Sequence, residues 1–137
     1  IDDVASLPTS QKYPVMLPAA CKEGYFISPS SSDYDRSSMG ETVVRVGGKG
    51  ALASWSPTSV GEAAGQHYLQ EGFYDAFNHG VHELGPATYL GKLNLYQNAE
   101  GDHRELIDTY VLFGDPALQI PMVHQHWAFM PLAVKGY

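Results

Sequence analysis

The sequence predicts an α/β fold in which helices cover the faces of a mainly parallel sheet. Three observations favour this class. Short apolar runs that are typical of buried strands alternate along the chain with longer segments of helical periodicity. The 137 residues suffice for one domain with one core, and 44% of them are apolar whereas 17% are charged. Nine Tyr, five Phe and two Trp supply the large side chains that can fill such a core.

The first strand is expected in residues 13–21, an apolar run that ends at or near Cys21. Pro14 suits the first residue of a strand, whereas Pro18 lacks the N–H that a ladder needs, so pairing should stop near it. The turn that follows, residues 22–24, then places Cys21 where a strand ends and a loop begins. Reactive groups of parallel sheets lie at this kind of position.

A serine-rich segment, residues 28–38, is expected to be a solvent loop. Ser38 and Glu41 have the spacing of a capping box, which predicts a short helix that ends at the glycine pair 47–48. This helix would lead into the next strand.

Residues 51–55 predict a second buried strand, and residues 56–61 form the loop that leaves it. Ser59 and Glu62 have the spacing of another capping box, which would open a helix that runs to about Asn78. The apolar face expected for this helix consists of Leu69, Phe73, Ala76 and Phe77.

A third helix is expected from about Pro86 to Asn98, since proline is permitted in the first turn. Its expected apolar set is Tyr89, Leu90, Leu93 and Tyr96.

The remaining residues predict shorter elements. Residues 104–110 favour a helical piece that passes into the apolar run 111–113, and a sharp turn precedes a strand at about 117–120. Residues 1–121 are expected to form one structural unit, with 122–137 as a tail or an additional strand.

Composition excludes several classes of function. The net charge of −7, with eight basic residues spread along the chain, argues against a nucleic-acid partner. No apolar run approaches the roughly 20 residues that span a bilayer. Neither a signal peptide nor a transit peptide is visible, and the start at Ile1 indicates a processing site or an artificial boundary. The single cysteine permits no internal disulfide and no zinc-type spacing, and no loop is acidic enough to argue for a structural calcium ion, so no cofactor is expected.

Three stretches together resemble the gingipain family of cysteine peptidases. Residues 18–26 are similar to the family's nucleophile at a strand end and the turn after it. Residues 51–59 resemble its pocket-wall strand and loop, and residues 108–118 resemble the closing segment of its catalytic domain. The ordered matches cover roughly residues 3 to 121.

The resemblance implies the C-terminal part of a caspase-like three-layer α/β sandwich, with a Cys-His dyad that hydrolyses peptide bonds. Cys21 would be the nucleophile, and the protein would be secreted or exposed at the cell surface. The family's catalytic histidine precedes the nucleophile strand, but no histidine here precedes His67. The resemblance therefore implies that an upstream segment or a partner chain, such as the N-terminal fragment of the same precursor, supplies it. The substrate-binding residues implied are Trp55, Ser56, Thr58 and Ser59.

Other interpretations stay open. Cys21 could be an inert, buried cysteine, Trp55 a core aromatic residue and Ser59 only a helix cap. The pair His79-Gly80 echoes a catalytic pattern, but a helix-end or surface role is favoured for this histidine. The main alternative function is a non-catalytic, caspase-like binding or scaffold module. An unrelated secreted binding domain is a third.

Three further groups of polar residues are weaker candidates. His82 and Glu83 could bind a metal, although two ligands are weak evidence. Asp115 is expected to be structural, because its Gly-Asp-Pro turn favours it. His124 and His126 are expected to have no catalytic role.

Overall fold

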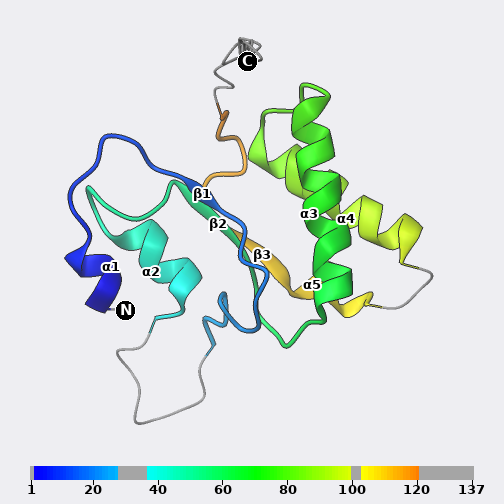
Figure 1. The fold of residues 1–137 in the computed structure, drawn as a ribbon, viewed down its shortest axis with the longest axis horizontal. Coiled ribbons are helices and arrows are strands. Elements are labelled where there is room, and N and C mark those ends of the chain that lie inside the picture. The colour runs from blue at the N-terminus through cyan, green and yellow to red at the C-terminus, as the bar shows by residue number, and fades with distance from the viewer. Residues whose placement is uncertain (1, 28–36, 100–102, 121–137) are drawn as a thin grey trace, which may run out of the picture.

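The structure is a computed structural model that describes residues 2–27, 37–99 and 103–120 (Figure 1). The α/β class is confirmed. Two expectations, the solvent loop over most of 28–38 and the tail at 122–137, lie outside the described residues. The elements are α1 (Asp2–Ser6), β1 (Val15–Met16), α2 (Met39–Arg45), β2 (Ala53–Pro57), α3 (Ala63–Asn78), α4 (Leu84–Asn98), α5 (Glu105–Thr109) and β3 (Tyr110–Phe113).

The sheet has three strands in the order β1-β2-β3, with β1 and β2 parallel and β2 and β3 antiparallel. It is therefore mixed rather than mainly parallel in the described part. The register pairs Pro57, at the carboxyl end of β2, with Tyr110, the first residue of β3. The hairpin of α3 and α4 brings the chain back to the end of the sheet from which it left, so β3 has to run in the opposite direction to β2.

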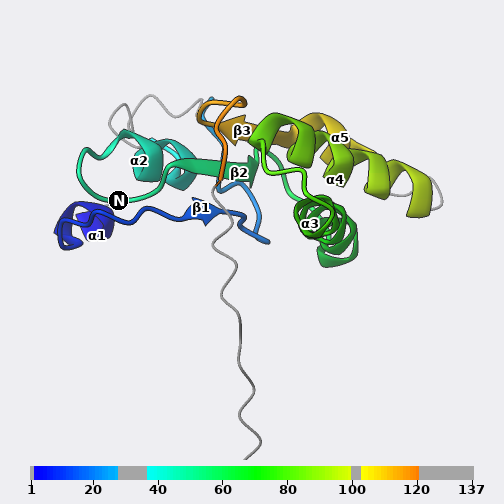
Figure 2. The same ribbon diagram turned by 90° about the horizontal axis from the view of Figure 1, so that it is seen from above.

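The sheet lies between two groups of helices, with α1 and α2 on one side and α3 and α4 on the other (Figures 1 and 2). Alternate side chains of β2 point to the two opposite faces of the sheet. Trp55 belongs to the larger core, on the side of α3 and α4, where its ring packs against Phe73 at 5.7 Å and Tyr110 at 5.3 Å between centroids. A smaller cluster of Val4, Val43 and Ala51 lies on the other side.

The capping box at α2 is confirmed. The Glu41 N–H donates to Ser38 Oγ at 3.3 Å, and the Ser38 N–H donates to the Glu41 carboxylate at 2.9 Å. The capping box expected at the start of α3 is wrong, because Glu62 is the N-cap and no side chain caps the helix. Ser59 donates its hydroxyl to the Val60 carbonyl instead, and its own carbonyl accepts the Lys22 N–H. The loop before α3 is thus bound to the Cys21 segment rather than folded back on its helix.

The apolar face expected for α3 is confirmed, since all four of its residues are buried. The face expected for α4 is wrong for its two tyrosines, because Tyr89 is 64% exposed and Tyr96 is 56% exposed, whereas Leu90 packs against the core. A Cβ placed on Gly91 would lie 2.7 Å from Trp55 Cη2 and 2.6 Å from the Leu69 carbonyl oxygen, so only small residues fit at this contact. The residues that α4 buries are Leu84, Ala87, Thr88, Gly91 and Leu95.

The expected strand at 117–120 is wrong, because only a single bridge between Glu83 and Gln119 forms there. The segment instead supplies hydrogen-bond acceptors to the start of α4. The Leu84 N–H donates to the Leu118 carbonyl at 3.1 Å, and the Gly85 N–H donates to the Pro116 carbonyl at 2.7 Å. These bonds satisfy first-turn N–H groups that have no partner inside a helix.

No helix within the described ranges is both long and apolar enough to cross a membrane.

Candidate active site

Cys21 lies in a loop beyond the carboxyl end of β1, and its side chain is exposed. The strand ends at Met16, earlier than the sequence predicted, because Pro18 has no N–H to donate to a ladder. Cys21 still follows the carboxyl end of a strand that runs parallel to β2, so the loops after both strands meet at one edge of the sheet. The exposure of the side chain argues against an inert, buried cysteine.

Three contacts join the Cys21 loop to the end of β2 and the loop that follows it. The Lys22 N–H donates to the Ser59 carbonyl at 3.0 Å, and the Gly24 N–H donates to the Pro57 carbonyl at 2.9 Å. The thiol of Cys21 donates to the Gly61 carbonyl at 3.6 Å. The sulfur is therefore held between two loops while remaining open to solvent.

The backbone is strained directly after the cysteine. Lys22 has a φ of 60°, in the left-handed region that residues other than glycine seldom adopt. Such a conformation costs on the order of 1–3 kcal/mol, and strained residues of this kind cluster at functional sites. Here it turns the chain so that Gly24 reaches back to β2.

The segment before Cys21 is tied to the core through its carbonyl groups. Gln70 donates its side-chain amide to the Leu17 carbonyl at 3.0 Å, and Gln66 donates to the Ala20 carbonyl at 2.8 Å. The Tyr110 hydroxyl donates to the Pro18 carbonyl at 3.0 Å. Sequence reasoning missed all three donors, because a single glutamine or tyrosine carries no local signal of a distant carbonyl partner.

The pKa of Tyr110 is also changed by its surroundings. Burial raises the pKa of Tyr110 to about 12, and the negative charge of an ionised Cys21 acts in the same direction. The phenol is thus neutral at ordinary pH and acts as a hydrogen-bond donor close to the thiol.

We expect Tyr110→Phe to change the pH dependence of stability. The pKa of Tyr110 is raised from 10.0 to about 12, so the unfolded chain loses this proton first. Its contribution to the free energy of unfolding is fully present below pH 10 and is lost as the pH rises to about 12. Urea unfolding at pH 9 should show the variant less stable by about 1 kcal/mol, because a hydrogen bond is lost. Between pH 10 and 12 the wild type should lose more stability than the variant; parallel curves would contradict the assignment.

The structure separates the four predicted substrate-binding residues. Trp55 is 1% exposed in the core, and Ser56 is completely buried, with its hydroxyl 2.5 Å from that of Ser54. Thr58 and Ser59 are half-buried in the loop that meets the Cys21 segment. Ser59 is therefore bound to the residue that follows the candidate nucleophile, whereas Thr58 is bound to Thr109. Trp55 and Ser56 are enclosed within the fold.

A hollow of about 230 Å³ lies next to this loop. Of the predicted residues only Thr58 lines it, and the segment that follows Cys21 forms one wall. Sequence reasoning missed the other residues, since only tertiary folding brings α5 and β3 beside residues 25–27. The full lining consists of Tyr25, Phe26, Ile27, Thr58, Asp108 and Val111.

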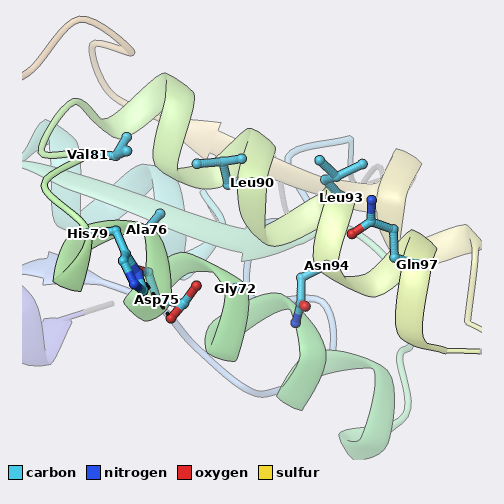
Figure 3. Close-up of a pocket in the computed structure, with 9 residues that line it drawn as sticks. All are labelled: Gly72, Asp75, Ala76, His79, Val81, Leu90, Leu93, Asn94 and Gln97. Atoms are coloured by element: carbon cyan, nitrogen blue, oxygen red, sulfur yellow. Dashed lines mark hydrogen bonds and ion pairs between the residues drawn. The ribbon is translucent and has the colours of Figure 1, made fainter.

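No histidine nitrogen within the described ranges lies at hydrogen-bond distance from the Cys21 sulfur. His79 caps the C-terminus of α3, where its Nδ1 lies 2.9 Å from the Asp75 carbonyl oxygen, at one end of a groove between α3 and α4 (Figure 3). Gln66, which contacts the Cys21 segment, lies 13 residues earlier on α3. This spacing corresponds to about 20 Å along a helix. The helix-end role expected for His79 agrees with this position.

His82 and His103 each contact a different neighbour. His82 stacks on Phe77 at 6.0 Å between ring centroids. His103 Nδ1 lies 3.8 Å from the Glu62 carboxylate. No group of three or more His, Cys, Asp or Glu side chains comes together in the part of the chain that the structure describes. His124 and His126 lie outside that part.

Comparisons with known proteins point to one family. The model of peptidase family C25 matches residues 1–121. A complex of the pro- and mature domains of RgpB from Porphyromonas gingivalis has a TM-score of 0.75 at 23% identity, over 87% of this chain and 29% of that chain. A crystal structure of the Arg-specific cysteine proteinase gingipain R (RgpB) has a TM-score of 0.68 at 23% identity, over 87% and 28% of the two chains. A search of curated proteins finds no match. The chain thus spans less than a third of these structures and shares their fold, as the resemblance implied.

Proposed function

The chain belongs to peptidase family C25, and on that basis we propose that it carries the nucleophile, Cys21, of a cysteine endopeptidase. The observation that supports this most directly is the exposed thiol of Cys21, held where the loops after two parallel strands meet. An exposed thiol at a fixed position can react with a peptide, whereas a buried one cannot.

The reaction requires a base that takes the thiol proton. The thiolate attacks the carbonyl carbon of the scissile bond, and the base returns the proton to the leaving amine. A thioester remains on Cys21 until water hydrolyses it. The N–H of Cys21 has no protein acceptor within the described ranges and is available to stabilise the oxyanion.

We propose that this base is a histidine from an upstream segment or a partner chain, such as the N-terminal part of the same precursor. Two observations support the proposal. No described histidine reaches Cys21. In addition, β1 pairs only with β2 among the described residues, so its outer edge can accept another strand. A similar structure is a complex of a pro-domain with a mature domain, which is consistent with a precursor that is cut. We also propose, from the family resemblance, that the protein is secreted or exposed at the cell surface.

The absence of a described histidine beside Cys21 also favours a second candidate, a binding or scaffold module that keeps the fold without turnover. Labelling separates the two. We expect the intact protein to gain one adduct per chain from peptidyl chloromethyl ketones, located at Cys21 by peptide mapping, because a thiolate beside a base displaces chloride. Cys21→Ala should gain none. A folded wild type that keeps its mass, although iodoacetamide modifies the same thiol, would favour the scaffold module.

A further inference from the structure

The three side-chain bonds to the segment before Cys21 are not equivalent. Gln70 and Tyr110 hold the carbonyls of Leu17 and Pro18, which lie further from the cysteine. Gln66 holds the carbonyl of Ala20, the group that belongs to the same peptide unit as the Cys21 N–H.

A peptide unit is planar and, in the described part of this chain, always trans. In a trans unit the C=O and the N–H point in opposite directions. The bond of 2.8 Å from Gln66 Nε2 to the Ala20 carbonyl therefore also fixes the direction of the Cys21 N–H. The carbonyl points towards α3, and the N–H points away from that helix.

Gln66 can hold the direction of this peptide unit because its own side chain has little conformational freedom. Its residue is 2% exposed, and it lies on the first turn of α3, which is packed in the core. A Cβ placed on Gly61 would lie 3.2 Å from the same Nε2, so the amide lies next to the space that a side chain at position 61 would occupy. The Gly61 carbonyl in turn accepts a hydrogen bond from the Cys21 thiol. The Gln66 amide is thus confined on one side by the backbone of Gly61 and bound on the other to the Ala20 carbonyl.

We propose that Gln66 is a positioning residue that aims the Cys21 N–H at the oxyanion formed during peptide-bond hydrolysis. This inference rests on the proposed function. The hydrogen bond of Gln66 ends on the Ala20 carbonyl and not on the sulfur, so Gln66 acts through the peptide unit between Ala20 and Cys21. A residue that only stabilised the fold would have no such selective effect.

The comparison of Gln66→Met with Gln70→Met tests this role. Both changes remove an amide donor from the same helix and replace it with an apolar side chain of similar length. We expect Gln66→Met to lower the initial rate of hydrolysis of dilute fluorescein-labelled casein by about 10- to 100-fold, because a misdirected oxyanion donor costs up to about 10³ in rate. Gln70→Met should stay within about threefold of the wild type.

A second measurement distinguishes an effect on the Cys21 N–H from an effect on the Cys21 sulfur. Iodoacetamide alkylates a thiolate by direct displacement of iodide and forms no oxyanion. Alkylation of Cys21 should therefore proceed at the wild-type rate, within about twofold, in both variants. If Gln66→Met slowed alkylation as much as hydrolysis, or if both variants lost the same activity, the proposed role of Gln66 would be overturned.

Two further variants keep the test decisive. Should Gln66→Met not fold, Gln66→Asn retains the amide but is one methylene too short to reach Ala20, and the same pair of results is expected from it. Cys21→Ala is measured in parallel. If it hydrolyses casein like the wild type, the proposed function fails, whereas loss of activity there with full activity in the Gln66 variants overturns only the positioning role.

Discussion

Cys21→Ala in the intact protein is expected to reduce peptide-bond hydrolysis by at least about 10⁴-fold, since removing a nucleophile eliminates the covalent route. The expected loss is large because the sulfur has no substitute in the chain, which contains a single cysteine. Hydrolysis of labelled casein, followed with the histidine-bearing part present, measures the effect.

The same change should leave the fold intact. The Cys21 side chain is exposed, and its one hydrogen bond, to the Gly61 carbonyl, is 3.6 Å long. Surface changes of this kind alter the free energy of unfolding by no more than about 0.5 kcal/mol. Cys21→Ser, which replaces the thiol with a hydroxyl of similar size, serves as the matched control and should be almost as inactive. A variant that lost activity only because it unfolded would show a shifted urea midpoint, and a variant that stayed active would exclude Cys21 as the nucleophile.

The parts of the fold that the sequence predicted well are those governed by local patterns. The apolar spacing of Leu69, Phe73 and Phe77 predicted the buried face of α3, because helical periodicity alone determines which side chains share a face. The capping box at Ser38 and Glu41 likewise involves only neighbours in the chain. The position of Cys21 beyond the carboxyl end of a strand followed from one apolar run and one turn.

The face of α4 could not be predicted in the same way. Its large residues Tyr89 and Tyr96 point to solvent, while Gly91 packs against Trp55. Whether a helix buries its large or its small residues depends on how close its neighbours approach, and this distance is a tertiary property. The pattern rule assumed that the largest apolar side chains are the buried ones.

The hydrogen bonds that hold the segment before Cys21 could not be predicted from the sequence for a related reason. The donors Gln66, Gln70 and Tyr110 lie 46, 53 and 92 residues from their carbonyl acceptors. A glutamine on a helix is an ordinary residue, and only the packing of α3 against the Cys21 segment makes it a specific donor. Resemblance to the family could point to the cysteine, whose chemistry is distinctive, but not to the amides that hold its backbone.

Trp55→Ala is expected to lower the free energy of unfolding by about 3–5 kcal/mol, the usual cost of removing a large buried aromatic side chain. Trp55 is 1% exposed, packs against the rings of Phe73 and Tyr110, and lies directly against Gly91. Its removal would leave a cavity at the point where the sheet, α3 and α4 meet. Because domains are stable by only about 5–15 kcal/mol, this one change should bring the fold close to unfolding at room temperature.

Tyr89→Ala is the matched control, because this aromatic residue is 64% exposed and its loss should change stability by no more than about 0.5 kcal/mol. Trp55→Phe provides a milder variant that should lose stability in the same direction while remaining folded. The experiment also decides between two roles for the residue. As part of the core, Trp55 should affect stability in urea unfolding and leave the KM for casein nearly unchanged in the folded Trp55→Phe variant. A raised KM with unaltered stability would instead return Trp55 to the wall of the substrate pocket, and would require the ring to turn out of the core that now encloses it.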